Sequence, residues 1–263
     1  MSFSPDVAQI IGLYLGRYEL IDWINPSSIR KSQLSYNPKA IDLLKANPDW
    51  INWKYSSQNP AIIDLLPTNP TKKYWNWICD EIDWQMLSEN PGAIKLLITN
   101  PDKIYWEYLS CNPAANGLLI ANPKKIDWKT LSCNPAAMPL LIANPEKIAW
   151  RELSGNSAAI SLLIANPKKI NWHWLSQNTS AIPLLQTDLD RIDWSRLSQN
   201  TSAIPILQAN LDKVNWMFLS ENPAAIDILK ANQGKIVWDR ISRNPAIFEL
   251  RPDPLIVDEL LEI

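Results

Sequence analysis

One pattern of apolar and polar positions recurs every 22 residues along most of the chain. Its most visible member is a tryptophan, found at Trp84, Trp106, Trp128, Trp150, Trp172, Trp194, Trp216 and Trp238. Counting from each Trp, Leu usually follows at +3, Ser at +4, Asn at +6 and a second Asn at +16, with Ala, Ile and a Leu pair between the two Asn. Spacing as regular as this indicates an array of stacked structural units.

The first Asn of the pattern extends the array beyond the tryptophans. It occurs at Asn37, Asn59, Asn90, Asn112, Asn134, Asn156, Asn178, Asn200, Asn222 and Asn244. These positions mark ten repeats, with nine extra residues between the second and the third. The insertion falls at residues 71–82, and we expect it to form a protruding loop because the array on either side is regular.

Each repeat carries two helix-start signals. Asn is a good N-cap, Pro fits the first helical position, and the residue before Pro is pushed out of the helical region. Two Asn–Pro steps per repeat therefore predict two short helices. The helix containing Trp must either be buried on two sides or begin after the Ile that precedes Trp by two residues. The second helix must begin late where Pro139, Pro183 or Pro205 would otherwise interrupt it.

The fold class predicted from these signals is all-α, an α-solenoid of about ten 22-residue repeats with two short helices each. We expect an open, gently curved rod about 90–100 Å long, with the tryptophans in its core. The alternative is a mixed solenoid like the leucine-rich repeats, whose period also includes 22 residues. Against it, the position where those repeats place Asn holds Leu109, Leu131 and Leu153.

The chain is expected to be one repeat domain over residues 1–263, because no Gly/Ser-rich linker divides it. Residues 31–244 hold the repeats. Residues 1–30 and 245–263 depart from the pattern, and we expect them to cap the first and last repeat, since terminal units of such arrays are atypical.

Composition narrows the classes of function. The chain is 46% hydrophobic with a net charge of −2, so no global basic field draws it to nucleic acid or to an anionic membrane. Polar residues interrupt every apolar run, which excludes a membrane-spanning helix. The start of the chain lacks the pattern of a signal peptide, and the three cysteines are an odd number. We therefore expect an intracellular protein that is not secreted.

Residues that carry chemistry are sparse. The chain has one histidine, His173, and six scattered glycines. It lacks a set of Cys, His or carboxylates at metal-ligand spacing, a phosphate-binding glycine loop and a nucleophile turn. The sequence thus predicts no catalytic residues, no metal, no cofactor and no small-molecule substrate, and we expect a protein that is not an enzyme.

Binding is expected at positions that vary while the scaffold stays the same. The two residues after each Trp vary, and they include Tyr108, Trp174 and Phe218, which are residue types that anchor interfaces. The alternative for these three is packing against a neighbouring helix. Trp75 and Trp77 in the insertion form a second candidate surface.

A column of cations lies three residues before successive tryptophans. It comprises Lys103, Lys125, Lys147, Lys169, Arg191, Lys213 and Lys235. Aligned cations could grip an acidic protein surface or a phosphate backbone. Alternatively, each pairs with a nearby acid or covers apolar surface with its stem. The acidic chain disfavours nucleic acid as the partner, so we expect other proteins.

With the unit IxWxxLSxNPxAIxLLxANPxKI laid out, the chain resembles the uncharacterised Trp/Asn–Pro repeat proteins of giant double-stranded DNA viruses, over about residues 29–245. The resemblance implies viral structural or host proteins as partners, and a place in the host cytoplasm, the virus factory or the virion. We accordingly expect a protein-binding or structural scaffold, as a virion or capsid-associated component.

A weaker likeness at the N-terminus suggests an alternative function. The stretch SPDVAQIIGLYLGRYELIDW is similar to the start of an F-box, the helical motif that docks ubiquitin-ligase scaffolds. It implies a substrate adaptor in which Ile10, Ile11, Leu13 and Leu15 are partly exposed. In the scaffold interpretation the same side chains are buried on the first repeat.

Overall fold

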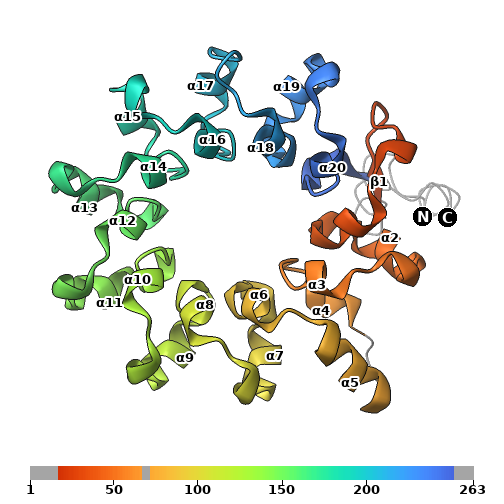
Figure 1. The fold of residues 1–263 in the computed structure, drawn as a ribbon, viewed down its shortest axis with the longest axis horizontal. Coiled ribbons are helices and arrows are strands. Elements are labelled where there is room, and N and C mark those ends of the chain that lie inside the picture. The colour runs from red at the N-terminus through yellow and green to blue at the C-terminus, as the bar shows by residue number, and fades with distance from the viewer. Residues whose placement is uncertain (1–16, 67–71, 252–263) are drawn as a thin grey trace, which may run out of the picture.

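The computed structural model describes residues 17–66 and 72–251, and in it the repeats close into a ring (Figure 1). The fold is an all-α solenoid, as predicted, with two layers of short helices. The inner layer consists of α3 (Trp53–Ser56), α6 (Trp84–Glu89), α8 (Trp106–Cys111), α10 (Trp128–Leu131), α12 (Trp150–Leu153), α14 (Trp172–Leu175), α16 (Trp194–Leu197), α18 (Trp216–Glu221) and α20 (Trp238–Ile241). The first repeat has a 3-10 helix, Lys31–Tyr36, at the equivalent position.

The outer layer is formed by the second helix of each of the first nine repeats (Figure 1). It consists of α2 (Ile41–Ala46), α4 (Ile62–Leu65), α7 (Ile94–Thr99), α9 (Asn116–Ala121), α11 (Met138–Ala143), α13 (Ile160–Ile164), α15 (Ile182–Leu185), α17 (Ile204–Gln208) and α19 (Ile226–Ala231). Two strands, β1 (Arg17–Leu20) and β2 (Phe248–Arg251), join the ends of the described chain.

The fifth repeat illustrates the local structure. Ile126 is extended, and α10 begins two residues later, because the Asp127 side chain accepts a hydrogen bond from the Thr130 N–H and caps the helix. The inner helix thus begins after the Ile, one of the two expected solutions. A 3-10 turn, Pro135–Ala137, precedes α11, which places Pro139 in the first turn of that helix. Proline is tolerated there because no helical hydrogen bond is lost.

The core lies between the two layers of helices. It is built from three columns of fully buried side chains: the Leu at +3 on the inner helix, an Ala just before the outer helix, and a Leu inside the outer helix. In the fifth repeat these residues are Leu131, Ala137 and Leu141, each 0% exposed. Small Ala between two larger Leu allows the layers to approach closely. Helices of four to six residues account for the short period of the repeat.

The first Asn of each repeat joins that repeat to the one before it. Its side-chain Nδ2 donates to two backbone carbonyls of the preceding repeat, at 2.7–3.3 Å in all ten repeats. Asn134, for example, reaches the carbonyls of Ser110 and Asn112, while its Oδ1 caps the Ala136 N–H. All ten amides are buried. Each Asn therefore acts both as a helix cap and as a bridge between repeats.

A second ladder uses the Ser at +4. Its Oγ donates to the carbonyl of the Trp four residues earlier and accepts the N–H that precedes the Trp of the next repeat. In the fifth repeat, Ser132 accepts from the Ala149 N–H at 3.0 Å. Because the buried Asn and Ser of the two ladders bond the neighbouring repeat in the same way at successive junctions, adjacent repeats have one fixed register.

Both ladders continue across the junction between the last and the first repeat. Asn37 donates to the carbonyls of Ser242 and Asn244, and Ser242 Oγ accepts the Arg30 N–H at 2.9 Å. These are the same bonds that join all other repeats. The expectation of an open rod is therefore wrong: ten equivalent junctions turn the chain through a full circle, about 36° for each repeat. We call the junction between the tenth and first repeats the seam.

The seam has additional contacts that other junctions lack. β1 and β2 pair antiparallel, with Leu20 opposite Phe248. Lys39 Nζ reaches the Phe248 carbonyl at 3.3 Å. Arg251 forms an ion pair with Asp22 at 2.7 Å. The described parts of the segments expected to cap the two ends of a rod thus pair with each other and close the ring.

The insertion between the second and third repeats is a helix, not the loop that we expected. Of its residues, Lys72–Glu81 form α5, on the outer side of the ring (Figure 1). Ile78 and Ile82 are buried in the core. Ile78 lies on α5, and Ile82 directly follows the helix, with its N–H bonded to the Ile78 carbonyl at 3.0 Å. Burial of these two side chains packs the insertion against the ring.

The junction after the insertion requires a glycine. A Cβ added at Gly92 would overlap the carbonyl oxygen of Pro60, whereas nothing lies within 4 Å of a Cβ added at Gly117. We expect Gly92→Ala to lower the free energy of unfolding by about 1–3 kcal/mol through overpacking. Gly117→Ala, within α9, is the control and should be neutral or stabilise by up to about 1 kcal/mol. Urea denaturation measures both, and equal values for the two variants would contradict this packing.

Candidate interaction surfaces

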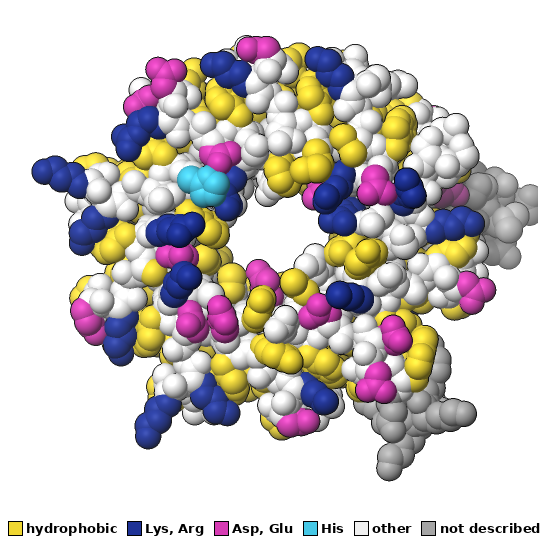
Figure 2. Space-filling model, in the orientation of Figure 1, with side chains coloured by type: hydrophobic (Ala, Val, Ile, Leu, Met, Phe, Trp, Pro, Cys, Tyr) yellow, Lys and Arg dark blue, Asp and Glu magenta, His cyan; other side chains and the backbone are white. Residues whose placement is uncertain are grey.

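The centre of the ring is an opening, and charged and apolar side chains surround it (Figure 2). The inner helices bound this opening, and their positions +1, +2 and +5 from Trp lie outside the core. Position +1 is mostly exposed and positions +2 and +5 mostly half-buried. These are the positions of the repeat at which residue type varies most.

Side chains at +2 and +5 contact one another from repeat to repeat, and we call this set the inner belt. The rings of Tyr36 and Tyr55 stack with centroids 4.7 Å apart. Arg240 pairs with Glu221 at 2.9 Å. Arg243 also contacts Glu221, and its guanidinium lies 4.1 Å from the Tyr36 ring centroid, across the seam. The inner belt therefore continues through the seam like the hydrogen-bond ladders.

Tyr108, Trp174 and Phe218, the aromatic residues singled out from the sequence, all lie in the inner belt at position +2. Each is half-buried, on α8, α14 and α18 respectively. Arg196 lies over the Trp174 ring at 4.4 Å, and the buried Trp174 Nε1 has no hydrogen-bond partner. The structure thus gives these side chains packing contacts within the ring and leaves part of each one accessible.

The single histidine belongs to a polar cluster next to Trp174. His173 Nδ1 lies 2.5 Å from Asp193 Oδ2, and Arg196 Nε lies 2.6 Å from His173 Nε2. A guanidinium only donates, so Nε2 accepts and Nδ1 carries the proton that is donated to Asp193. Burial opposes ionisation of Asp193, but hydrogen bonds from the Arg196 N–H and from His173 outweigh it and lower the pKa of that carboxyl. The hydrogen bond between Arg196 and His173 holds the guanidinium over the Trp174 ring.

Two of the three cysteines are neighbours in the inner belt. Cys111 and Cys133 occupy position +5 of successive repeats, and both are free thiols. Cys111 donates a hydrogen bond to Cys133, which raises the pKa of Cys111 and lowers the pKa of Cys133. Both remain half-buried.

Most of the cation column covers tryptophan rings. Six of its seven cations lie over the Trp of the preceding repeat, 19 residues earlier. The separation between the cation and the ring centroid is 4.1 Å for Lys169 over Trp150 and 5.0 Å for Lys213 over Trp194. The seventh, Lys103, is exposed. Covering apolar surface was one of the two alternatives for this column, and the rings it covers are only half-buried.

The first two repeats show the same contact with the residues exchanged. Lys31 occupies the Trp position of the first repeat, and Trp50 occupies the cation position of the second. Lys31 Nζ lies 4.4 Å from the Trp50 ring centroid. The cation–π contact is thus present at this junction although the two residue types have exchanged positions.

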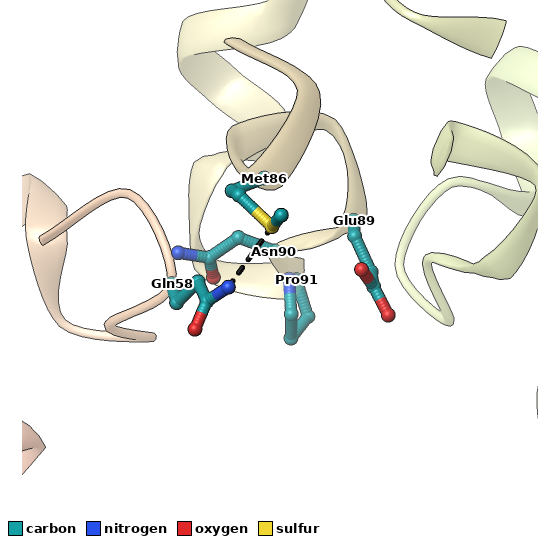
Figure 3. Close-up of a pocket in the computed structure, with 5 residues that line it drawn as sticks. All are labelled: Gln58, Met86, Glu89, Asn90 and Pro91. Carbon is teal, nitrogen blue, oxygen red and sulfur yellow. Dashed lines mark hydrogen bonds between the residues drawn. The ribbon is translucent and has the colours of Figure 1, made fainter. Parts of the chain in front are cut away.

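A recess of about 350 Å³ interrupts the inner belt between the second and third repeats (Figure 3). Gln58 and Met86 point toward each other, with Gln58 Nε2 2.9 Å from Met86 Sδ, and Glu89 points away from this pair. Asn90 and Pro91 complete the lining. Its volume lies at the lower end of the range for ligand sites, so it can accept one side chain of a partner.

The remaining sequence candidates are only partly described. Trp77 is 48% exposed on α5. The side chain of Trp75 lies outside the described residues, as do Ile10, Ile11, Leu13 and Leu15, which carry the F-box likeness. Within residues 17–66 and 72–251, no three His, Cys, Asp or Glu side chains are grouped to hold a metal ion. Over the same ranges, none of the helices has the length and apolar character needed to cross a bilayer.

One surface was missed from the sequence. Isoleucines follow the Leu pair of the outer helix in four consecutive repeats and are strongly exposed: Ile98, Ile120, Ile142 and Ile164. The available signal was a change of residue type, because the same position holds Gln or Lys in other repeats.

Comparison with known proteins adds no assignment to these surfaces. The chain matches no protein-family model, and neither a curated protein nor a solved structure is similar enough to it to count as a match.

Proposed function

We propose that the protein is a non-enzymatic scaffold that binds other proteins, and that its inner belt is the recognition surface. The observation that carries this proposal is the contrast between two sets of positions. The Asn, Ser and Leu positions that build the ring hold nearly the same residue in every repeat, whereas +1, +2 and +5 vary. Variable side chains on a fixed frame are the usual arrangement of a binding surface.

The composition of the inner belt supports a protein partner. It includes Tyr36, Tyr55, Tyr108, Trp174 and Phe218 together with arginines. Aromatic residues, Met and Arg are enriched at the centre of protein interfaces. Its acids and bases are mixed, as in the pair of Arg240 with Glu221, which does not favour a uniformly charged polymer such as nucleic acid.

The dimensions of the ring fit a helical or extended segment in the opening. Ten inner helices spaced by about 8–10 Å give a circle about 25–32 Å across between helix axes. Subtracting one helix diameter, about 10–12 Å, leaves an opening about 15–20 Å wide. A partner helix fits such an opening and reaches side chains from several repeats at once.

The partner and the cellular place follow from the resemblance to giant-virus repeat proteins. On that basis we propose viral structural proteins or host proteins as partners, in the host cell or in the virion. The exposed ammonium groups of the cation column offer a second contact, for acidic surfaces. Because six of the seven cations already cover rings, we assign the main recognition to the inner belt.

Proximity labelling in expressing or infected host cells, read by quantitative mass spectrometry, tests this proposal. Tyr108→Thr with Phe218→Thr removes two belt aromatics, and Thr130 shows that the fold accepts Thr at +2. The matched variant is Lys213→Glu with Lys235→Glu in the cation column. Circular dichroism confirms that both variants are folded. We expect partner labelling to fall at least about tenfold in the first variant and to persist in the second.

Two outcomes would overturn the proposal. Labelling that is unchanged in the Thr variant but lost in the Glu variant would move recognition to the cation column. Ubiquitin-ligase components retained in both variants would instead favour the F-box adaptor, whose docking residues lie outside the inner belt.

A further inference from the structure

Four consecutive outer helices present isoleucines to solvent. Ile98 on α7, Ile120 on α9, Ile142 on α11 and Ile164 on α13 are 56%, 63%, 65% and 58% exposed. They occupy the same position of repeats three to six, so they form a row on one sector of the ring. We call them the isoleucine row. Large apolar side chains exposed together on successive repeats are the kind of surface that marks an interaction site.

The fold does not require isoleucine at this position. The equivalent residue is Lys45 in the first repeat, Gln186 and Gln208 in the seventh and eighth, and Lys230 in the ninth. Three of these four side chains lie on outer helices of the same kind, and Gln186 immediately follows one. Because the ring forms equally well with polar residues there, the isoleucines do not serve the core.

The sector that carries the isoleucine row is basic. Its outer helices and second Asn–Pro turns hold the exposed cations Lys95, Lys103, Lys124, Lys125, Lys147, Lys168 and Lys169 and the exposed acids Asp102 and Glu146. Seven cations and two acids give this sector a net charge of +5, in a chain whose overall charge is −2. Within the described residues, none of these lysines belongs to an ion pair.

The lysines lie close to the isoleucines along the chain. Lys124 and Lys168 follow Ile120 and Ile164 by four residues, at the turn that directly succeeds each outer helix. The end of the outer helix and its turn are therefore at the same edge of the repeat. Protruding aliphatic side chains bordered by lysines are the arrangement by which peripheral proteins bind an anionic bilayer.

We propose that the isoleucine row and its lysines form a docking surface for an anionic lipid bilayer. A second copy of the same surface is disfavoured, because pairing would bring seven lysines against seven lysines. An acidic protein is less suited, because the isoleucines protrude from the ring and each would need a separate pocket in the partner. A fluid bilayer surrounds protruding side chains without such pockets, and its anionic headgroups complement the lysines.

Vesicle co-sedimentation of the full chain tests the proposal. The probes are vesicles of phosphatidylcholine alone and of phosphatidylcholine with about one third phosphatidylserine, at low and at physiological salt. We expect binding to the anionic vesicles that weakens as salt rises. Ile120→Gln with Ile142→Gln, and separately Lys124→Gln with Lys168→Gln, should each reduce the partition coefficient at least about tenfold. The matched control, Lys45→Gln with Lys230→Gln on the other sector, should leave it unchanged.

Thermal denaturation shows whether each variant retains the fold, and Gln186 and Gln208 indicate that it does. The proposal is wrong if the wild-type chain does not sediment with anionic vesicles, or if it binds neutral vesicles equally well. It is also wrong if the isoleucine variant binds like wild type. Concentration-dependent self-association that the isoleucine variant abolishes would identify a second copy as the occupant instead. None of these outcomes bears on the inner belt, so this test is independent of the proposed function.

Discussion

Asn134→Asp is expected to lower the free energy of unfolding by about 3–5 kcal/mol, the largest effect of any single polar substitution that we predict. The new carboxylate keeps the cap on the Ala136 N–H but cannot donate to the carbonyls of Ser110 and Asn112. Two buried acceptors then face a buried anion, and each lost hydrogen bond leaves a penalty of about 1–3 kcal/mol. Urea denaturation followed by circular dichroism measures the loss.

The same repeat offers a control. Asn144 is the second Asn, half-buried, and its Nδ2 bonds the Leu140 carbonyl within its own repeat at 2.9 Å. Asp188 already occupies the equivalent position of the seventh repeat. Asn144→Asp should therefore cost no more than about 1 kcal/mol. Equal losses for the two variants would show that the Asn134 bridge between repeats contributes nothing beyond an ordinary helix cap.

Phe248→Ala is expected to destabilise the seam by about 3 kcal/mol, because Phe248 is buried on β2 and leaves a cavity when truncated. A closed ring has no terminal repeat. A ring that opens at the seam has two terminal repeats, the first and the tenth. We therefore expect amide hydrogen exchange to accelerate first in the first and tenth repeats. Repeats five and six, on the far side of the ring, should keep their protection (Figure 1).

Leu250 lies two residues further along β2, is exposed and provides the control. Leu250→Ala should change the free energy of unfolding by less than about 0.5 kcal/mol and leave the exchange pattern as in wild type. Uniform acceleration around the whole ring in Phe248→Ala would mean that the seam is not a separate point of opening.

Much of the fold could be predicted from the sequence because its determinants are local. Asn–Pro steps specify where helices begin, and the Trp recurs every 22 residues from Trp84 to Trp238. The delayed start of the outer helix around Pro139 also followed from local rules, since proline is acceptable only in the first turn. The insertion was expected to be a loop because it interrupts a regular array. That expectation rested on its position and not on its own sequence, so its helix was missed.

Ring closure could not be predicted in the same way. It depends on the rotation between repeats, and a small change in that angle separates a ring from an open superhelix. A signal was nevertheless present at the two ends. In an open rod, Asn37 would have no earlier repeat to bridge and Ser242 would have no later one. Both positions nevertheless hold the Asn and the Ser that join one repeat to the next. In the structure these two residues bond to each other's repeats.

For the candidate surfaces too, features of the local sequence could be predicted, whereas contacts between repeats could not. Position +2 was found because it varies next to Trp, and the structure places Tyr108, Trp174 and Phe218 in one inner belt. One alternative drawn from the sequence was that the cation column covers apolar surface. That each ring belongs to the preceding repeat could not be predicted, because the contact spans 19 residues across an interface. The isoleucine row depends on exposure, which a short apolar helix does not reveal by pattern alone.

A cysteine pair across the seam tests ring closure most directly. Tyr18 and Leu250 are exposed and lie opposite each other in the β1–β2 pair, within the range of Cα separations that a disulfide spans. The measurement uses Tyr18→Cys with Leu250→Cys, the three native cysteines changed to Ser, and oxidised glutathione as oxidant. The ring predicts a monomer with an internal disulfide and a native circular dichroism spectrum. Free thiols, or disulfide-linked dimers only, would show that the ends lie far apart and that the chain is an open rod.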